Sequence, residues 1–506
     1  PSRFTTAVDK IVLNRFLGLP IFLFVMYLMF LLAINIGGAL QPLFDVGSVA
    51  LFVHGIQWIG YTLHFPDWLT IFLAQGLGGG INTVLPLVPQ IGMMYLFLSF
   101  LEDSGYMARA AFVMDRLMQA LGLPGKSFVP LIVGFGCNVP SVMGARTLDA
   151  PRERLMTIMM APFMSCGARL AIFAVFAAAF FGQNGALAVF SLYMLGIVMA
   201  VLTGLMLKYT IMRGEATPFV MELPVYHVPH VKSLIIQTWQ RLKGFVLRAG
   251  KVIIIVSIFL SAFNSFSLSG KIVDNINDSA LASVSRVITP VFKPIGVHED
   301  NWQATVGLFT GAMAKEVVVG TLNTLYTAED IQNEEFNPQT FSLGEELLAA
   351  VDETWQGLKD TFSLSVLANP IEASKGDGEM ATGAMGVMGS KFGSAAAAYS
   401  YLIFVLLYIP CISVMGAIAR ESSRGWMTFS ILWGLNIAYS LSTLYYQTVS
   451  FSDHPRYSLV CILAVVLFNV VLFGLLRRAR SRVDVSLLAT RKTPASCCSS
   501  PAGDCH

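Results

Sequence analysis

Three cysteines lie where apolar stretches of the sequence are interrupted by residues that break helices. Cys137 lies in the motif GFGCNVP, Cys166 follows Pro162 by four residues, and Cys411 directly follows Pro410. Thiolate donors suit Fe(II), Cu(I) and Zn, whereas hard ions such as Mg²⁺ and Ca²⁺ prefer oxygen. The pattern therefore predicts a transition-metal site. The alternative is that each cysteine is a small buried hydrophobe, which fits Cys461 in its unbroken apolar stretch.

Two further side chains could share a site with these thiols. Met164 lies two residues before Cys166 and offers a weak thioether ligand, although most of the 23 Met residues are expected to fill the core. Glu316 follows Lys315 inside an apolar stretch, where a charge near the bilayer centre costs about 2.5–3.5 kcal/mol and usually pairs or lines an ion path. Glu316 is predicted to be an oxygen ligand or a proton carrier, with a structural ion pair as the alternative.

Two other groups are candidates for an accessory metal role. Glu102 and Asp103 lie near Arg109 just after an apolar stretch. We interpret the three residues as a charge cluster at a helix end, with a role in ion entry as the less favoured alternative. The last ten residues hold ligand types that can capture a soft cation, although a chain terminus fixes little geometry. These residues are Cys497, Cys498, Cys505 and His506.

The composition shows which kind of structure must position these residues. Of 506 residues, 55% are hydrophobic and 13% are charged, and the mean hydropathy is +0.66. Soluble domains average roughly 45–50% apolar and 25% charged residues, so a soluble enzyme is excluded. The net charge of +2 comes without a basic patch that would bind nucleic acid. We expect an all-α polytopic membrane protein that is not itself an enzyme, with lipid as its surroundings.

About eight spanning helices are predicted, because a span needs roughly 20 predominantly apolar residues. The candidates are 17–37, 83–101, 155–181, 187–211, 246–268, 395–419, 427–449 and 457–476. The stretch 47–65 contains His54, Gln57 and His64 and is predicted to be interfacial. Two more apolar stretches, 127–147 and 302–324, are interrupted by Gly and Pro or by charge.

Charge in the loops predicts the topology, since cytoplasmic loops are rich in Lys and Arg. The start of the chain, the stretch 208–251 and the tail 477–492 are basic, so both termini are predicted to be cytoplasmic. Eight crossings leave both termini on the cytoplasmic side only if 127–147 and 302–324 each enter and leave by the same face. These two stretches are therefore predicted to be re-entrant hairpins that enter from opposite faces, and the acidic stretch 325–394 is predicted to be external. Opposite hairpins indicate an inverted repeat, which places a binding site near the bilayer midplane.

The predicted organisation has eight parts. They are a cytoplasmic segment (1–16), the first spans with the interfacial region (17–126), the first repeat (127–211), a basic cytoplasmic loop (212–251), a span with the second hairpin (252–324), an acidic insert (325–394), the second repeat helix with the last spans (395–476), and a basic, Cys-rich tail (477–506).

At these motifs the sequence resembles the membrane portion of the ferrous iron transport protein B family, FeoB, of the enterobacterial type. The resemblance covers nearly the whole chain and rests on GFGCNVP around Cys137, PFMSCGAR around Cys166, the stretches around Glu316 and Arg109, and the residues up to Cys411. It implies two Gate repeats and a route for Fe²⁺ along the three cysteines. It also implies an N-terminal GTPase domain, with GTP and Mg²⁺ bound there; no P-loop precedes Pro1, so we expect that this domain is missing here.

These observations predict an Fe²⁺ uptake permease in the bacterial inner membrane, whose weak multi-site path of thiols and carboxylate lets the ion leave as well as bind. The resemblance also implies FeoA-like and FeoC-like cytoplasmic partners, and it leaves a homo-oligomer open. One alternative is an ion-coupled carrier of an organic solute such as a nucleoside. Another is a membrane receptor or assembly platform in which the helix breaks are only structural.

Overall fold

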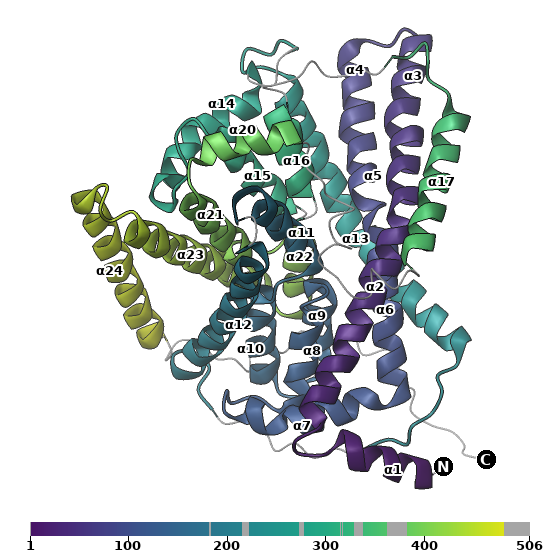
Figure 1. Cartoon of the computed structure of the whole chain (residues 1–506), viewed down its shortest axis with the longest axis vertical. Coiled ribbons are helices and arrows are strands. Elements are labelled where there is room, and N and C mark those ends of the chain that lie inside the picture. Colours follow the sequence, from purple (N-terminus) through teal and green to yellow (C-terminus); the bar gives the residue numbers. More distant parts are fainter. Residues whose placement is uncertain are drawn as a thin grey trace, which may run out of the picture.

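The computed structural model describes residues 2–181, 184–214, 222–272, 278–313, 315, 317–327, 337–361 and 382–479. Every regular element in these ranges is a helix (Figure 1), which confirms the predicted all-α class. Five of the described helices are long and apolar enough to cross a membrane, or six if a bent pair at Pro151–Leu170 and Ile172–Phe181 forms one span. The chain is therefore a polytopic helical membrane protein, and the count of eight spans stays a prediction.

Two long helical rods form one side of the molecule (Figure 1). The first, Gly18–Thr62, consists of α2 (Gly18–Ser48), η1 (Val49–His54) and α3 (Gly55–Thr62). The second, Asp67–Ser104, consists of α4 (Asp67–Ile71), η2 (Phe72–Gly78), α5 (Gly79–Val84) and α6 (Leu87–Ser104). The stretch 47–65, predicted to be interfacial, mostly continues the first rod. The whole first rod, Gly18–Thr62, has 45 residues and would extend about 68 Å, which is more than the roughly 30 Å of bilayer hydrocarbon.

The first predicted hairpin is a pair of short helices, α8 (Phe128–Val133) and α9 (Asn138–Gly144). Residues 134–137 between them are not helical, as the glycines of the motif predict. The hydroxyl of Ser141 on α9 donates a hydrogen bond of 2.5 Å to the carbonyl of Pro130 on α8. This bond crosses from one arm to the other, so the chain reverses at the motif that contains Cys137.

The second predicted hairpin consists of α15 (Trp302–Met313) and α16 (Val317–Thr327). Two glycines let the arms approach closely: a Cβ atom at Gly307 would lie 3.0 Å from the Leu322 side chain, and one at Gly311 would lie 2.6 Å from the Val318 side chain. Gly307 pairs with Leu322 and Gly311 with Val318, and the midpoint of both pairs in the sequence lies next to Lys315. The chain therefore reverses at Lys315. In Figure 1 this hairpin lies in the upper half of the molecule and the α8–α9 hairpin lies in the lower half.

Two longer apolar stretches are also broken. One is formed by α10 (Pro151–Met160), η5 (Ala161–Phe163), α11 (Gly167–Phe176) and η6 (Ala177–Phe181), and the other by α21 (Ala395–Leu407) and α22 (Ile412–Glu421). Their side chains fill the largest apolar cluster of the molecule, which includes the buried Phe173, Phe176 and Tyr401. The broken helices therefore form the densely packed centre rather than its margin.

The other helices surround this centre or extend from it. They are α1 (Ser2–Val12), α7 (Tyr106–Gln119), η3 (Gly125–Ser127), η4 (Ala145–Thr147), α12 (Gly185–Tyr209), α13 (Val231–Ser265), α14 (Ala280–Ile288), η9 (Thr289–Ile295), α20 (Thr382–Phe392), α23 (Arg424–Val449) and α24 (Pro455–Ala479). α24 has the highest hydropathy of the candidate spans, 3.0, and the most apolar window of this helix has no buried residue. Such a helix requires lipid around it.

Part of the acidic insert packs on the first rod. Helix α17 (Leu343–Thr361) runs beside α2 (Figure 1), where the backbone of Ala39 lies close to Gly357. Nδ1 of His54 lies 3.0 Å from a carboxylate oxygen of Glu346, which joins the insert to η1. Helix α17 of the insert is thus attached to the first rod, on the side away from α24.

The close packing of the second hairpin gives a first prediction. Gly311→Ala is expected to lower stability by about 1–3 kcal/mol, because the new methyl group would overlap Val318 and the hydroxyl of Tyr408. Gly416→Ala in α22 is the matched control, since no atom outside its own helix segment lies within 4 Å of a Cβ there. The measurement is the unfolding midpoint of the purified protein in detergent. A midpoint for Gly311→Ala equal to or above that of Gly416→Ala would contradict the packing described.

Candidate functional site

Each of the three predicted cysteines occupies the residue just before a helix. Cys137 precedes α9, Cys166 precedes α11 and Cys411 precedes α22, each with an extended ψ angle between 131° and 168°. The helix breaks predicted from Gly and Pro are therefore present, with a thiol at each. In a membrane, such irregular backbone is tolerated only where it is buried in protein or lines a cavity.

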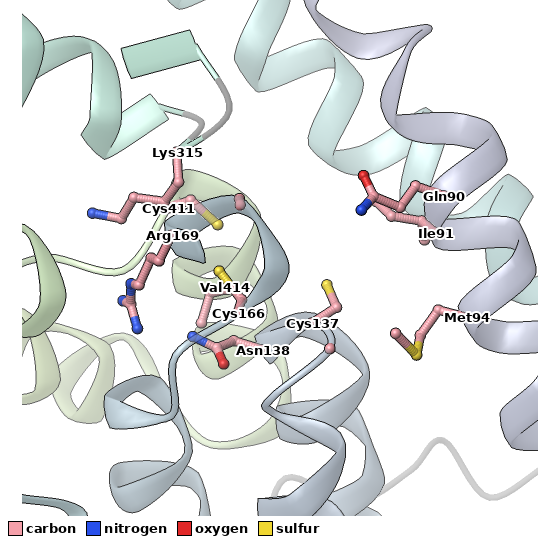
Figure 2. A pocket seen from close by; sticks show the side chains of 12 residues that line it. Gln90, Ile91, Met94, Cys137, Asn138, Cys166, Arg169, Lys315, Cys411 and Val414 are labelled. Carbon is pink, nitrogen blue, oxygen red and sulfur yellow. The ribbon is translucent and has the colours of Figure 1, made fainter. Parts of the chain in front are cut away.

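The structure brings all three cysteines to one cavity of about 60 Å³. Figure 2 shows the side chains of Cys137, Cys166 and Cys411 on one wall, with Gln90, Ile91 and Met94 of α6 across from them. The lining also includes Asn138, Arg169, Lys315 and Val414. The cavity thus brings together residues that are more than 300 positions apart in the sequence, and three of its lining side chains are thiols.

Side chains at the cavity satisfy the carbonyl groups that the helix breaks release. Arg169, 1% exposed, donates from one terminal nitrogen to the carbonyls of Pro162 and Met164, each at 2.9 Å. Asn138, 4% exposed, also contacts this break through Pro162 at 3.4 Å. The backbone NH of Gly167 donates to the carbonyl of Gly136 at 3.3 Å. The breaks that hold Cys137 and Cys166 are therefore linked by hydrogen bonds.

Lys315 performs the same role at the third break. Its ammonium group donates to the carbonyl of Ile409 at 3.1 Å and lies 3.5 Å from the centre of the Tyr408 ring. The residue is only 2% exposed. Lys315 therefore ties the tip of the second hairpin to the break that holds Cys411, and this explains why a cation is retained in an apolar stretch.

The thiols do not form a preformed chelate in this conformation. Among the residues the structure describes, no group of three or more His, Cys, Asp or Glu side chains could hold a metal ion together. Two cationic side chains, Arg169 and Lys315, also line the cavity. A structural zinc site closes four ligands tightly around the metal. Separate donors beside buried cations suit brief, weak contact with an ion instead.

The other predicted site residues have different positions. Met164 packs against Gly134 and does not line the cavity, although its carbonyl accepts from Arg169. Glu316 lies outside the described residues, as do Cys497, Cys498, Cys505 and His506. The structure therefore leaves their predicted metal roles as predictions.

Glu102 and Asp103 lie at the end of α6, away from the thiols. A carboxylate oxygen of Glu102 lies 3.2 Å from a terminal nitrogen of Arg241 on α13. Glu102 follows Met94 by eight residues, which corresponds to about 12 Å along a helix. The partner of Glu102 is thus Arg241, whereas Arg109 of the predicted cluster pairs with Asp9, and neither Glu102 nor Asp103 lines the cavity.

Arg109 of that cluster is the centre of a buried junction. Its Nε lies 2.6 Å from Asp9 on α1, and its terminal nitrogens donate to the carbonyls of Gly105 and Pro224. The guanidinium carbon lies 3.8 Å from the centre of the Tyr226 ring. Burial raises the pKa of the Tyr226 phenol, and the charge of Arg109 opposes that rise. Arg109 thus joins α1, α7 and the segment before α13.

Sequence reasoning missed the α6 side of the cavity. Gln90 is a polar side chain within the predicted span 83–101, and Met94 lies one helical turn further on. A polar residue inside an apolar span is itself a signal of function, and this signal could have identified Gln90. Met94 has no such signal, because it is one of 23 Met residues.

Fold and site together define a polytopic helical membrane protein with a thiol-lined cavity at helix breaks. Comparison with known families agrees with this class. The Gate model, described as nucleoside recognition, matches residues 84–180 and 246–424. The model described as ferrous iron transport protein B C terminus matches residues 189–241.

Curated relatives match the chain from end to end. Proteins named Fe(2+) transporter FeoB are 94% identical in an Escherichia coli strain, 93% in Shigella flexneri and 92% in Salmonella typhi, each over 100% of this chain and 66% of the relative. The chain belongs to the FeoB family. It spans slightly less than two thirds of the length of these relatives. No solved structure matches it.

Proposed function

We propose that this chain is the membrane part of a ferrous iron uptake permease of the bacterial inner membrane. The observation that carries the proposal is the meeting of Cys137, Cys166 and Cys411 at one cavity where three helices begin. The relatives that match the whole chain are named as Fe(2+) transporters. In this proposal Fe²⁺ is the cargo, and it passes from thiol to thiol rather than remaining bound.

The three cavity thiols of the described residues stand before three separate helices, and this arrangement supports transport over storage. An ion that is conducted must bind strongly enough to enter and weakly enough to leave. Thiols on separate helices can meet that requirement if the ion contacts them in turn. Glu316, which follows Lys315 in the sequence, is proposed as an oxygen ligand or proton carrier on the same route.

The proposed topology places both termini in the cytoplasm and makes both hairpins re-entrant in an inverted repeat. The pentapeptide Ser-Val-Met-Gly-Ala occurs at Ser141–Ala145 and again at Ser413–Ala417. Both copies follow a cavity cysteine, and α9 packs beside α22. Nε of Arg146 lies 2.7 Å from each carboxylate oxygen of Glu421, just beyond the two copies. An ion pair between these positions supports a common depth for both, and the proposed topology assigns that depth to the cytoplasmic side.

The proposal assigns control of the route to parts outside this chain. GTP and Mg²⁺ would bind the N-terminal domain that the family resemblance implies, and FeoA-like and FeoC-like proteins would bind on the cytoplasmic side. The Cys-rich tail is proposed as an accessory cation collector, and a homo-oligomer as the assembly.

The size of the cavity favours an ion over an organic solute. Pockets for small organic ligands enclose roughly 300–1,000 Å³, whereas this cavity encloses about 60 Å³. A nucleoside, which the description of the Gate model would suggest, therefore does not fit in this conformation. The receptor alternative has no comparable observation in its favour.

The test is transport by the full-length protein in cells that lack other routes for iron and for nucleosides. We expect saturable accumulation of radiolabelled Fe²⁺ under reducing conditions and none of labelled nucleoside above vector-only cells. Accumulation of nucleoside without iron would replace this proposal by the carrier alternative. Accumulation of neither, with the protein correctly inserted, would favour the receptor.

A further inference from the structure

Gln90 faces the three thiols from the opposite wall of the cavity. It lies in the first turn of α6, and in Figure 2 its carboxamide points toward the cavity. Within the described part of the chain, its side chain makes no hydrogen bond. Gln90 is half-buried, so its carboxamide is accessible from the cavity and can take a polar partner there. A ligand in the cavity can be that partner.

The position of Gln90 is fixed by the contact between the two long rods. A Cβ atom at Gly37 on α2 would lie 2.8 Å from the Cα of Gln90, so glycine lets the two helices touch at this residue. Ile91 and Met94, which also line the wall, are 8% and 3% exposed. The carboxamide therefore stands on a rigid helix rather than on a loop, as a site that selects its ligand requires.

Oxygen at this position changes which ion the cavity prefers. Sulfur donors alone favour Cu(I) and Zn²⁺, and for a given site Zn²⁺ generally binds more tightly than Fe²⁺. An amide oxygen is a harder donor and reduces the advantage of Zn²⁺. We propose that Gln90 supplies an oxygen ligand opposite Cys137, Cys166 and Cys411, and that this ligand sets the preference for Fe²⁺ over Zn²⁺. The inference rests on the proposed transport of Fe²⁺.

The test compares donor atoms at position 90 in the full-length protein. Gln90→Met replaces the carboxamide by a thioether of similar length, and Gln90→Glu keeps an oxygen donor. Gln75→Met is the matched control, because Gln75 lies on the same rod, accepts a hydrogen bond from Ser265 and does not line the cavity. The measurement is the Zn²⁺ concentration that halves the uptake of radiolabelled Fe²⁺.

We expect the Zn²⁺ concentration that halves Fe²⁺ uptake to be about tenfold lower for Gln90→Met than for the unmodified protein. This lies at the low end of the roughly 10–100-fold effects seen when the surroundings of a metal are altered. Gln90→Glu and Gln75→Met should stay within about twofold of the unmodified protein. An unchanged value for Gln90→Met, or equal shifts for Met and Glu, would overturn the assignment of Gln90 while Fe²⁺ transport itself stands. If the unmodified protein takes up no Fe²⁺, the proposed function fails instead. If Gln90→Met is not inserted into the membrane, the fallback is a binding measurement on purified Gln90→Leu, in which Zn²⁺ competes with Fe²⁺. The assignment of Gln90 is overturned if the Zn²⁺ concentration that displaces half of the Fe²⁺ is the same for Gln90→Leu as for the unmodified protein.

Discussion

Replacing Cys137, Cys166 and Cys411 together by alanine is expected to lower Fe²⁺ uptake at least about 100-fold. The three thiols are the sulfur donors that the helix breaks bring to one cavity. Loss of even an indirect contact to a metal costs roughly 10–100-fold in affinity or activity, so loss of all three direct donors should exceed this range. The measurement is the initial rate of radiolabelled Fe²⁺ uptake by cells that carry the full-length protein.

The control for this variant is Cys461→Ala. Cys461 lies on α24, whose helix is unbroken, and it does not line the cavity. We expect this variant to transport iron at the unmodified rate. Single replacements at the three cavity cysteines should each have an intermediate effect, because an ion passed between donors loses one step at a time. Undiminished uptake by the triple variant, at normal amounts in the membrane, would exclude a route along the thiols.

Replacing Arg169 by alanine is expected to destabilise the protein by about 2–6 kcal/mol. The guanidinium group is 1% exposed and is the donor for the carbonyls of Pro162 and Met164. A buried carbonyl that loses its donor costs about 1–3 kcal/mol; the Met164 carbonyl would lose the Arg169 donor, and the Pro162 carbonyl would keep only the 3.4 Å contact from Asn138. The expected result is a lower unfolding midpoint in detergent and loss of the break that positions Cys166.

Two further variants separate this effect from the loss of a positive charge. Arg169→Lys keeps the charge but offers a single point donor, so it should recover only part of the stability. Arg213→Ala removes an exposed arginine that donates to one carbonyl, and we expect a change within about 0.5 kcal/mol. A midpoint for Arg169→Ala that equals that of Arg213→Ala would show that the break at Cys166 does not depend on this side chain.

Much of the site could be predicted because helix breakers act locally. Gly134, Pro162 and Pro410 interrupt apolar runs, and the structure places a cysteine at the start of a helix after each of them. The two hairpins could be predicted for the same reason, since Gly and charge within an apolar run oppose a continuous span. Both appear as paired helices, although how deeply they enter the membrane is still a proposal.

The opposite wall of the cavity could not be predicted with these rules. Gln90 faces the thiols across the cavity from a helix that Gly37 lets approach α2 closely, and a contact between distant helices leaves no periodic pattern in either one. The number of spans was uncertain for another reason. The predicted span 427–449 lies within α23, whose polar residues lower the mean hydropathy of its long windows. The predicted span 246–268 overlaps the end of α13, of which Ile253–Ser265 is a shorter apolar stretch among the described residues. Tertiary packing, rather than local hydropathy, supports such helices.

The central claim concerns where iron lies in the protein, and anomalous scattering at the iron absorption edge tests it most directly. Crystals of the full-length protein, grown with Fe²⁺ under reducing conditions, would be measured above and below the edge. The account predicts an anomalous peak inside the cavity, within bonding distance of at least one of the three sulfur atoms. Iron found only on the acidic insert or the C-terminal tail, with an empty cavity, would contradict it.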